Sequence, residues 1–291
     1  MQFQSLGKAF DRLWYASLSS NTADGLLFAA LPLLAAALTQ DPVMISLNSA
    51  LSSLPWLLFA VVIGGVTDRV NRRWLLAGSQ LVRAAVAMAV GLLVHTGHMT
   101  FAALCLGTFI WGVCEVVGDT TSQALIPQML GPDQLEQANS RLNVSETVLQ
   151  NFIGVPLGGW LYVAVGALPF ALGGVGIAIS AVLVFAIPRS ATALPPRDPA
   201  HEHHSFWQDI RFGISYLYNH AKLRRLVLFT STLSFLYSAA HSTFVLFALN
   251  EVHIPREQFG AAMMLSGIGG LIGASMTPRW SSRWGRGRVM T

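Results

Sequence analysis

The stretch "IGGVTDRVNRRWLL", Ile63 to Leu76, places a short charged segment between two long apolar ones. It holds four charged residues in a chain of which only 11% is charged and 53% is hydrophobic. A soluble domain normally carries about 25% charged residues, and the mean hydropathy here is +0.53. The composition therefore predicts a polytopic membrane protein in which this stretch is a loop between two spans.

Apolar runs of about 20 residues elsewhere in the chain predict further membrane-spanning helices. We expect eight spans in all, near residues 14–38, 46–67, 74–95, 99–126, 138–164, 167–187, 224–248 and 258–279. The predicted fold is an all-α polytopic membrane protein. Its expected parts are an N-terminal six-helix bundle over 1–188, a Pro-rich cytoplasmic linker with an amphipathic helix over 189–223, and a partial second bundle over 224–291.

The Lys and Arg residues are distributed unevenly about these spans. Sixteen of the 18 lie before the first span or in every second loop, and the exceptions are Arg83 and Arg256. The positive-inside rule assigns the basic side to the cytoplasm. We therefore expect a multi-pass protein of the plasma (inner) membrane, surrounded by lipid, with a cytoplasmic N-terminus. The net charge of +4 then reflects topology, and we expect no nucleic-acid partner.

The opening loop carries a recognisable motif. Its spacing G-x-x-x-D-R-x-N-R-R is formed by Gly64, Asp68, Arg69, Asn71, Arg72 and Arg73. It resembles the signature G-x-x-x-D-R-x-G-R-R of the loop between spans two and three in the major facilitator superfamily, and departs from it at Asn71. Because Asn tolerates a left-handed backbone better than other non-Gly residues, we expect the tight turn to be kept.

The resemblance implies that this loop is a conformational switch. In family members the counterpart of Asp68 contacts the N-terminal end of a helix in the other half of the protein, where a carboxylate is favourable by about 0.3–1 kcal/mol. Such a clasp would close the cytoplasmic side and break during transport. The alternative role for the arginines is topology determination alone, but only the clasp accounts for Asp68.

Two further stretches resemble the exporter branch of the same superfamily. "GVPLGG", with Gly154, Pro156, Gly158 and Gly159, is similar to the element G-P-x-x-G-G on span five, with the proline shifted by one place. "GVCEVVGDTTSQALIPQML" followed by "LEQAN" resembles the span four to five region of the drug:proton antiporter-like group, which includes siderophore (enterobactin) and macrolide exporters. The glycines favour close helix contact, which would serve either rocking of two bundles or static packing.

Members of this group have twelve spans, whereas eight are predicted here. The resemblance therefore implies a complete N-terminal six-helix bundle and the first two helices of the C-terminal bundle. An internal repeat ("DRVNRRWLL" at 68–76 and "SRWGRGRVM" at 282–290) agrees, because repeated halves are typical of secondary transporters. Three explanations stay open: a fragment, a truncated gene product, or one part of a split transporter whose C-terminal half is a separate partner.

Four charged residues within the predicted spans are candidates for function, because charge at membrane depth is costly. Asp24, Arg83 and Glu115 each lie about 14–17 Å from the cytoplasmic ends of their spans, near the middle of a core of about 30 Å. Asp119 follows Glu115 by one helical turn, and two carboxylates so close do not both ionise easily. We expect a proton-coupling and substrate-orienting set, with Arg83 as the partner of one carboxylate of this pair. The alternative is a structural ion-pair network.

Other side chains in the spans favour structural roles. Asp119 is nearer the cytoplasm than Glu115, so a structural or gating contact with Arg69 or Arg72 is expected for it. Arg141 and Glu146 lie near the entrance of span five and are interpreted as structural. For Trp111 and other aromatic residues of spans two and four, an apolar substrate cavity and a lipid-facing position both stay open.

The predicted function is secondary active transport: proton-coupled export of a small amphipathic molecule, such as a drug, siderophore or metabolite, by alternating access. No phosphate-binding motif G-x-x-x-x-G-K-[ST] occurs in the sequence, which argues against ATP as the energy source. No nucleophile–base pair or metal motif accompanies the acids, so we expect neither an enzyme nor a cofactor or metal site. The alternative is a transport-incompetent remnant or one part of a split transporter.

Overall fold

The computed structural model describes residues 6–67, 69–192, 211 and 215–265. Most of the predicted linker and amphipathic segment, the second loop motif at 282–290 and the end of the eighth predicted span lie outside these residues, as does Asp68. Where the chain is described, its regular elements are helices. This confirms the predicted all-α class.

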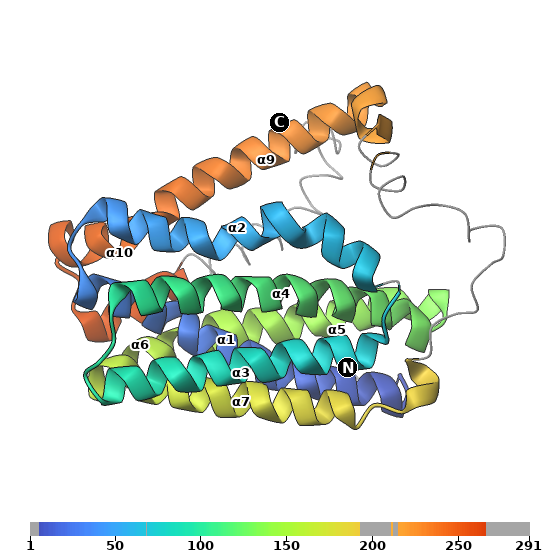
Figure 1. Ribbon diagram of the computed structural model, residues 1–291, viewed down its shortest axis with the longest axis horizontal. Coiled ribbons are helices and arrows are strands. Elements are labelled where there is room, and N and C mark those ends of the chain that lie inside the picture. Colours follow the sequence, from blue (N-terminus) through green and yellow to red (C-terminus); the bar gives the residue numbers. More distant parts are fainter. Residues whose placement is uncertain (1–5, 68, 193–210, 212–214, 266–291) are drawn as a thin grey trace, which may run out of the picture.

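Five long helices form most of the bundle in Figure 1, and each is long and apolar enough to cross a membrane. They are α1 (Lys8–Leu38), α2 (Pro42–Thr67), α3 (Arg72–His95), α4 (Phe101–Met129) and α7 (Leu168–Phe185). They correspond to the predicted spans one to four and six. The protein is therefore a multi-pass membrane protein, as its composition predicts.

The turn between α3 and α4 shows how local sequence ends these helices. Gly97 has a left-handed φ of 72°, and the His98 N–H bonds back to the Leu93 carbonyl at 2.9 Å. This is the long hydrogen bond of a Schellman motif, which needs a residue such as glycine at the left-handed position. The Thr100 hydroxyl then accepts from the Ala103 N–H at 3.2 Å and caps the start of α4.

The fifth predicted span is helical, but it is not one regular α-helix. It consists of α5 (Leu135–Glu146), the π-helix η2 (Thr147–Gly154) and α6 (Val155–Ala164). Pro156 accounts for the irregularity, because it has no N–H to donate and its ring collides with the carbonyl four residues earlier in a regular helix. The wider π turn lies directly before it, where the Val155 N–H bonds back to Gln150. Such π segments are frequent at functional sites.

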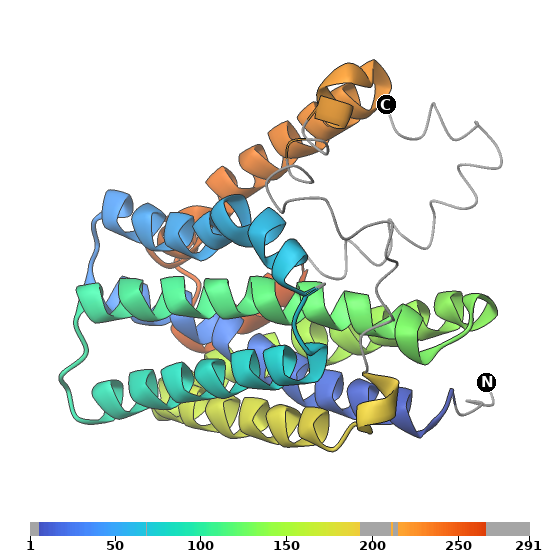
Figure 2. The ribbon, with the colours of Figure 1, turned by 45° about the vertical axis from the view of Figure 1, so that its right-hand side comes forward.

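Of the predicted linker with its amphipathic helix, residues 215–219 are helical in the described chain. They are followed by α9 (Ala221–Ser242), which falls on the predicted seventh span. It continues as the short turn α10 (Phe244–Leu246), the π-helix η5 (Phe247–Glu251) and a helix over 256–265. Figures 1 and 2 show α9 projecting from the bundle, with one end beside α2. α9 is not among the five helices that by length and composition could cross a membrane.

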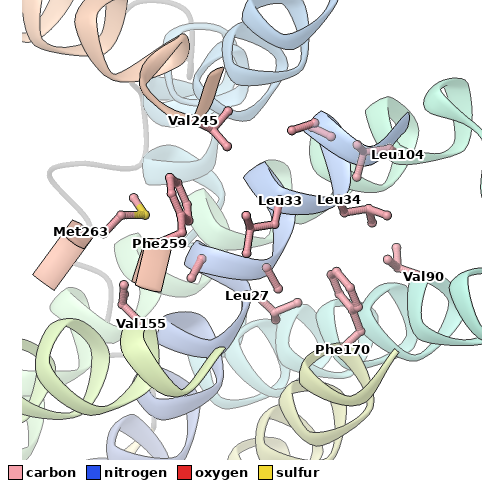
Figure 3. Close-up of a cluster of buried hydrophobic side chains, with 14 of the residues drawn as sticks. Leu27, Leu33, Leu34, Val90, Leu104, Val155, Phe170, Val245, Phe259 and Met263 are labelled. Carbon is pink, nitrogen blue, oxygen red and sulfur yellow. The ribbon is translucent and has the colours of Figure 1, made fainter. Parts of the chain in front are cut away.

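The apolar core lies in two clusters, and α1 runs through both. One cluster joins Leu33 of α1 to Phe170 of α7 and to Phe259 in the helix over 256–265, so the six-helix bundle and the C-terminal helices share it (Figure 3). The other cluster includes Phe10 and lies at the opposite end, where α1 begins, α2 ends, α3 begins and α7 ends. We call this the basic end, because several arginines bind there. Short 3-10 turns, η1 (Pro132–Gln134) and η3 (Arg189–Ala191), lie at the same end.

Glycines bring α1 and the fifth span into contact backbone to backbone. A Cβ on Gly154 would lie 2.7 Å from the Cα of Gly25, and Gly158 fits equally close against α1. Gly159 faces Gly260 of the C-terminal helices, where an added Cβ would lie 3.0 Å from the Gly260 nitrogen. Helices associate in membranes through such close approach, because apolar surface alone gives little attraction there. A role of these glycines in the rocking of the two bundles stays a prediction.

Replacing Gly158 by alanine is expected to destabilise the bundle, because the added methyl group would overlap the α1 backbone. Overpacking of this kind costs about 1–3 kcal/mol. Gly78→Ala is the matched control: the same methyl group meets open space on α3, and alanine is favoured over glycine in a helix by about 1 kcal/mol. Thermal unfolding in detergent should give a lower midpoint for Gly158→Ala and an unchanged or higher one for Gly78→Ala. Equal midpoints would contradict the backbone contact.

Candidate functional site

A cavity of about 570 Å³ lies inside the bundle, a size typical of small-molecule sites. It extends along α1 from Leu13 to Asp24 and along α4 from Pro127 back to Glu115. At the rise of an α-helix, it reaches about 16 Å into the bundle from the basic end. Much of its wall is polar. The uncharged polar residues that line it are Ser17, Ser20, Asn21, Gln80, Ser122, Gln123, Asn139, Asn143, Gln150 and Ser180.

An ion pair lies at the inner end of this cavity. Arg83 of α3 donates from Nη2 to Oδ1 of Asp24 on α1. The arginine side chain is 4% exposed and the aspartate 19%, so the pair is buried but borders the cavity. Nη1 of Arg83 donates to Oε1 of Gln80 at 3.1 Å, and Nε2 of Gln80 donates to the Ser180 hydroxyl of α7 at 3.3 Å. Three helices are thereby joined around one positive charge.

A further contact of Arg83 is aromatic. Its guanidinium carbon lies 4.3 Å from the centre of the Trp111 ring on α4, within the range of a cation–π interaction. Trp111 is half-buried. The sequence leaves two positions open for Trp111, lining an apolar substrate cavity or facing lipid. It does not predict the contact of Trp111 with a buried charge.

The pairing of Arg83 differs from the sequence expectation. The arginine is predicted to neutralise one member of the Glu115 and Asp119 pair, but it bonds to Asp24 instead. The rotation of each helix about its axis decides which carboxylate faces α3, and packing sets that rotation. Sequence reasoning also misses Gln80, although a polar residue one turn before Arg83 in an apolar span is a usable signal.

Three further carboxylates line the cavity beside this pair. Glu115 is half-buried on α4, Asp119 follows it by one turn, and Glu146 lies at the end of α5. Within the described part of the chain, none of these three carboxyl groups has a hydrogen-bond or ion-pair partner. The charges of Arg83 and Asp24 act on Glu115 and Asp119 through space. The structure therefore gathers the four predicted charged residues in one cavity and adds Glu146.

The arginines of the loop motif bind the backbone of three helices. Arg72 is 8% exposed and donates to the carbonyl of Thr67 at the end of α2 (3.2 Å) and to that of Ala124 in α4 (3.1 Å). Arg73 donates to the carbonyl of Phe185 at the end of α7, and its guanidinium lies over the Phe185 ring. The C-terminal end of a helix carries partial negative charge, so cations stabilise it.

Long-range contacts also tie α1 into the basic end. Arg12 donates to the carbonyl of Ala186, directly after α7. The Trp14 indole N–H donates to the Ser145 hydroxyl of α5 at 2.8 Å. The first helix is therefore fixed to both the fifth and the sixth spans at this end.

Asn71 adopts a different conformation from the predicted one. Its backbone is extended (φ −61°, ψ 110°), and its side chain accepts from the Arg73 N–H at 3.1 Å as the N-cap of α3. The predicted left-handed turn at Asn71 is therefore wrong. Asn is also a preferred N-cap residue, and at this position that preference determines the turn.

The clasp predicted from the loop motif stays a prediction. Asp68 lies outside the described residues, and Gly64 has open space where a Cβ would lie. Asp119 lies in the cavity wall and, where the chain is described, forms no ion pair with Arg69 or Arg72. Its gating role stays a prediction as well.

Comparison with known proteins identifies relatives over most of the chain. The sequence model of the Major Facilitator Superfamily matches residues 13–291. The uncharacterized MFS-type transporter YceJ of Bacillus subtilis (strain 168) is 26% identical over 237 residues, which are 80% of this chain and 56% of that protein. Macrolide efflux protein A of Streptococcus pyogenes is 21% identical over 270 residues, which are 89% of this chain and 65% of that protein. The chain thus spans less than two thirds of the length of these relatives.

Two solved structures resemble the described fold. A bacterial homolog of the human lysosomal transporter Spinster, in an inward-facing and unoccupied conformation, has a TM-score of 0.68 at 14% identity and covers 95% of this chain and 63% of that one. A bacterial homologue of the iron transporter ferroportin in an inward-facing state has a TM-score of 0.64 at 16% identity and covers 97% and 70%. This likeness is one of fold alone. It confirms the expected six-helix bundle followed by the first helices of a second bundle.

Removing one partner of the Asp24–Arg83 pair is expected to destabilise the bundle, because the other charge is left buried and uncompensated. Loss of one partner of a fully buried pair costs about 3–5 kcal/mol, and we expect the lower part of that range because Asp24 is 19% exposed. Asp24→Asn should lower the midpoint of thermal unfolding in detergent, and adding Arg83→Gln should recover part of the loss. Asp133→Asn, at an exposed position in η1, is the control. Losses that simply add in the double variant would contradict this interpretation.

Arg72→Met is expected to loosen the turn between α2 and α3, because it removes both hydrogen bonds to backbone carbonyls. A hydrogen bond to a charged group contributes about 1.5–3 kcal/mol, so the thermal midpoint should fall. Arg225→Met, at an exposed position on α9, is the matched control and should change stability by less than about 0.5 kcal/mol. Arg72→Lys should restore little, because lysine lacks the planar fork that reaches two acceptors. An unchanged midpoint for Arg72→Met would argue that these bonds do not stabilise the turn.

Proposed function

The chain belongs to the major facilitator superfamily, and we propose that it acts as a secondary active transporter of the plasma (inner) membrane. In this proposal a small amphipathic molecule is exported in exchange for protons by alternating access. The observation that carries the proposal is the Asp24–Arg83 ion pair at the inner end of a polar cavity within apolar helices. Charged residues at membrane depth are costly, and they mark substrate and proton pathways.

Protons are the proposed coupling ion. Glu115 and Asp119 follow one another along the cavity wall with a spacing of about 6 Å on α4, and Glu146 lines the same cavity. These carboxylates form a route by which a proton from solution reaches Asp24. A proton on Asp24 makes the carboxyl neutral and weakens its attraction to Arg83. The tie between α1 and α3 then loosens.

The proposed alternating access connects this ion pair to the contact between the two bundles. Asp24 is followed directly by Gly25, which touches η2 of the fifth span, and Gly159 further along that span touches Gly260. A shift of α1 at Asp24 would therefore be passed to the C-terminal helices through the fifth span. Surfaces made of glycine let helices slide past one another, because no side chains interlock across them.

The cavity and one relative support the proposed substrate class and direction of transport. A volume of about 570 Å³ accommodates a drug-sized ligand. The wall combines carboxylates and amides with apolar residues such as Leu13, Ile126 and Val184, which suits an amphipathic molecule. The similar Macrolide efflux protein A is an efflux protein by name, and it supports export rather than import.

The loop motif completes the proposal as a switch at the cytoplasmic side. The positive-inside rule assigns the basic end, and the N-terminus with it, to the cytoplasm. Arg72 and Arg73 hold the helix ends there, and Asp68 would grip a helix of the second bundle. The same proposal divides the chain into a bundle over 1–188, a linker over 189–223 and a partial second bundle over 224–291.

The alternative proposal is a chain that inserts into the membrane but does not transport by itself. It would be a remnant or one part of a split transporter, with the other half as its partner. The chain spans 56% and 65% of the length of the two curated relatives. In that case the cavity would bind protons and substrate, but alternating access would need the second partner.

Transport by the purified chain in liposomes tests these two proposals. With a pH gradient across the membrane, we expect the vesicles to take up a labelled macrolide while protons move in the opposite direction. A protonophore should abolish the uptake. Asp24→Asn should lower its rate by about tenfold or more, which corresponds to about 1.4 kcal/mol in a rate-limiting step.

The control for this experiment is Glu136→Gln, which removes an exposed acid of α5 outside the cavity wall and should leave the rate unchanged. A well-inserted chain without any uptake would favour the alternative proposal. Uptake that persists with the protonophore and in Asp24→Asn would exclude proton coupling through this site.

A further inference from the structure

Arg83 carries a positive charge that the bundle must accommodate whatever the state of Asp24. Its guanidinium does not lose its proton in proteins, and its side chain is 4% exposed. Among the described residues, it is the one basic side chain in the cavity wall. The ion pair neutralises this charge while Asp24 is ionised. Once Asp24 is protonated, its carboxyl can still accept a hydrogen bond but no longer neutralises the guanidinium, so the contacts that other residues supply matter more.

Two residues supply such contacts. Gln80 offers its side-chain oxygen, 3.1 Å from Nη1, and Trp111 offers its ring, centred 4.3 Å from the guanidinium carbon. The same ring borders a small apolar pocket lined by residues such as Leu27, Val90 and Phe170. The ring therefore lies between the charge and an apolar part of the bundle. A cation–π contact is strongest where water is excluded in this way.

We propose that Trp111 is a positioning residue that holds the Arg83 guanidinium in place when the Asp24 carboxyl is protonated. Its role in transport rests on the proposed function, in which Asp24 takes up a proton. The face of an indole ring is negative and attracts the cation. This attraction increases when the carboxylate no longer neutralises the guanidinium. Gln80 by itself offers one uncharged acceptor, which does not replace an ion pair.

The neighbouring charges explain why the guanidinium needs to be held. The charged groups around Asp24 are Arg83 on α3, Glu115 and Asp119 on α4, and Glu146 on α5. Without Trp111, a guanidinium held less strongly by the neutral Asp24 carboxyl would be drawn towards these carboxylates and into the cavity. Because Trp111 keeps it at the inner end, the pair with Asp24 forms again when the proton leaves.

A double-mutant cycle on the full chain tests this inference. The midpoints of thermal unfolding in detergent are measured for the wild type, Trp111→Leu, Asp24→Asn and the double variant. Asp24→Asn imitates the protonated carboxyl. We expect the loss caused by Trp111→Leu to be about 2–4 °C larger in the Asp24→Asn chain than in the wild type. Equal losses in the two backgrounds would mean that Trp111 only fills space, and they would overturn the inference.

Two further variants separate the ring face from side-chain volume. Trp111→Phe keeps an aromatic face and should show a smaller difference between the two backgrounds than Trp111→Leu. In Arg83→Met, which removes the cation, the difference should disappear. A difference that persists without Arg83 would also overturn the inference.

The same comparison is possible if the double variant does not fold. The midpoints of the wild type and Trp111→Leu are then compared at decreasing pH, and the gap between them should widen as the cavity carboxyls become protonated. A constant gap would contradict the inference. These stability measurements need no transport activity, so failure of the inference and failure of the proposed transport function are distinguishable.

Discussion

A positive charge that cannot be removed lies among apolar helices, and the surrounding structure is arranged to stabilise it. Arg83 is neutralised by Asp24 on α1, donates a hydrogen bond to Gln80 and lies against the Trp111 ring of α4. Gln80 in turn donates to Ser180 on α7. A buried charge is tolerated only when its surroundings compensate for lost solvation. Four helices must therefore approach one another at this depth, namely α1, α3, α4 and α7. Their approach closes the inner end of the cavity.

The two faces of α1 have different tasks at neighbouring positions. Asp24 faces the cavity and the arginine, while Gly25 faces η2 of the fifth span at backbone distance. The electrostatic site and the helix contact thus lie on adjacent residues of a single helix. Pro156 prevents a regular helix in the fifth span, so the contact of Gly25 is made with a π turn. In the proposed mechanism, this adjacency would connect a change of charge at Asp24 directly to the helix contact.

The sequence predicts much of this arrangement and fails where helix rotation decides the outcome. Apolar runs locate the long helices because the bilayer fixes their length, and charge at depth singles out Asp24 and Arg83 as a functional candidate set. Each residue turns a helix by about 100°, so spacing within one helix does not say which carboxylate meets Arg83. The Trp111 contact depends on the same rotation and is beyond the reach of sequence alone. The prediction for Asn71 is wrong for another reason. Asn favours both a left-handed turn and the N-cap position of a helix, and at this position the capping preference determines the conformation.

The contacts of α1 join residues that are far apart in the chain, so they cannot form until the later helices have been synthesised. Asp24 meets Arg83 at a separation of 59 residues, Trp14 meets Ser145 at 131, and Arg12 meets Ala186 at 174. The carboxyl group of Asp24 therefore has no contact with Arg83 until the third helix has been synthesised. Arg12, also on the first helix, reaches the Ala186 carbonyl only after the sixth helix has been synthesised. The end of the bundle at Arg12 is therefore completed only by the segment of chain directly after α7.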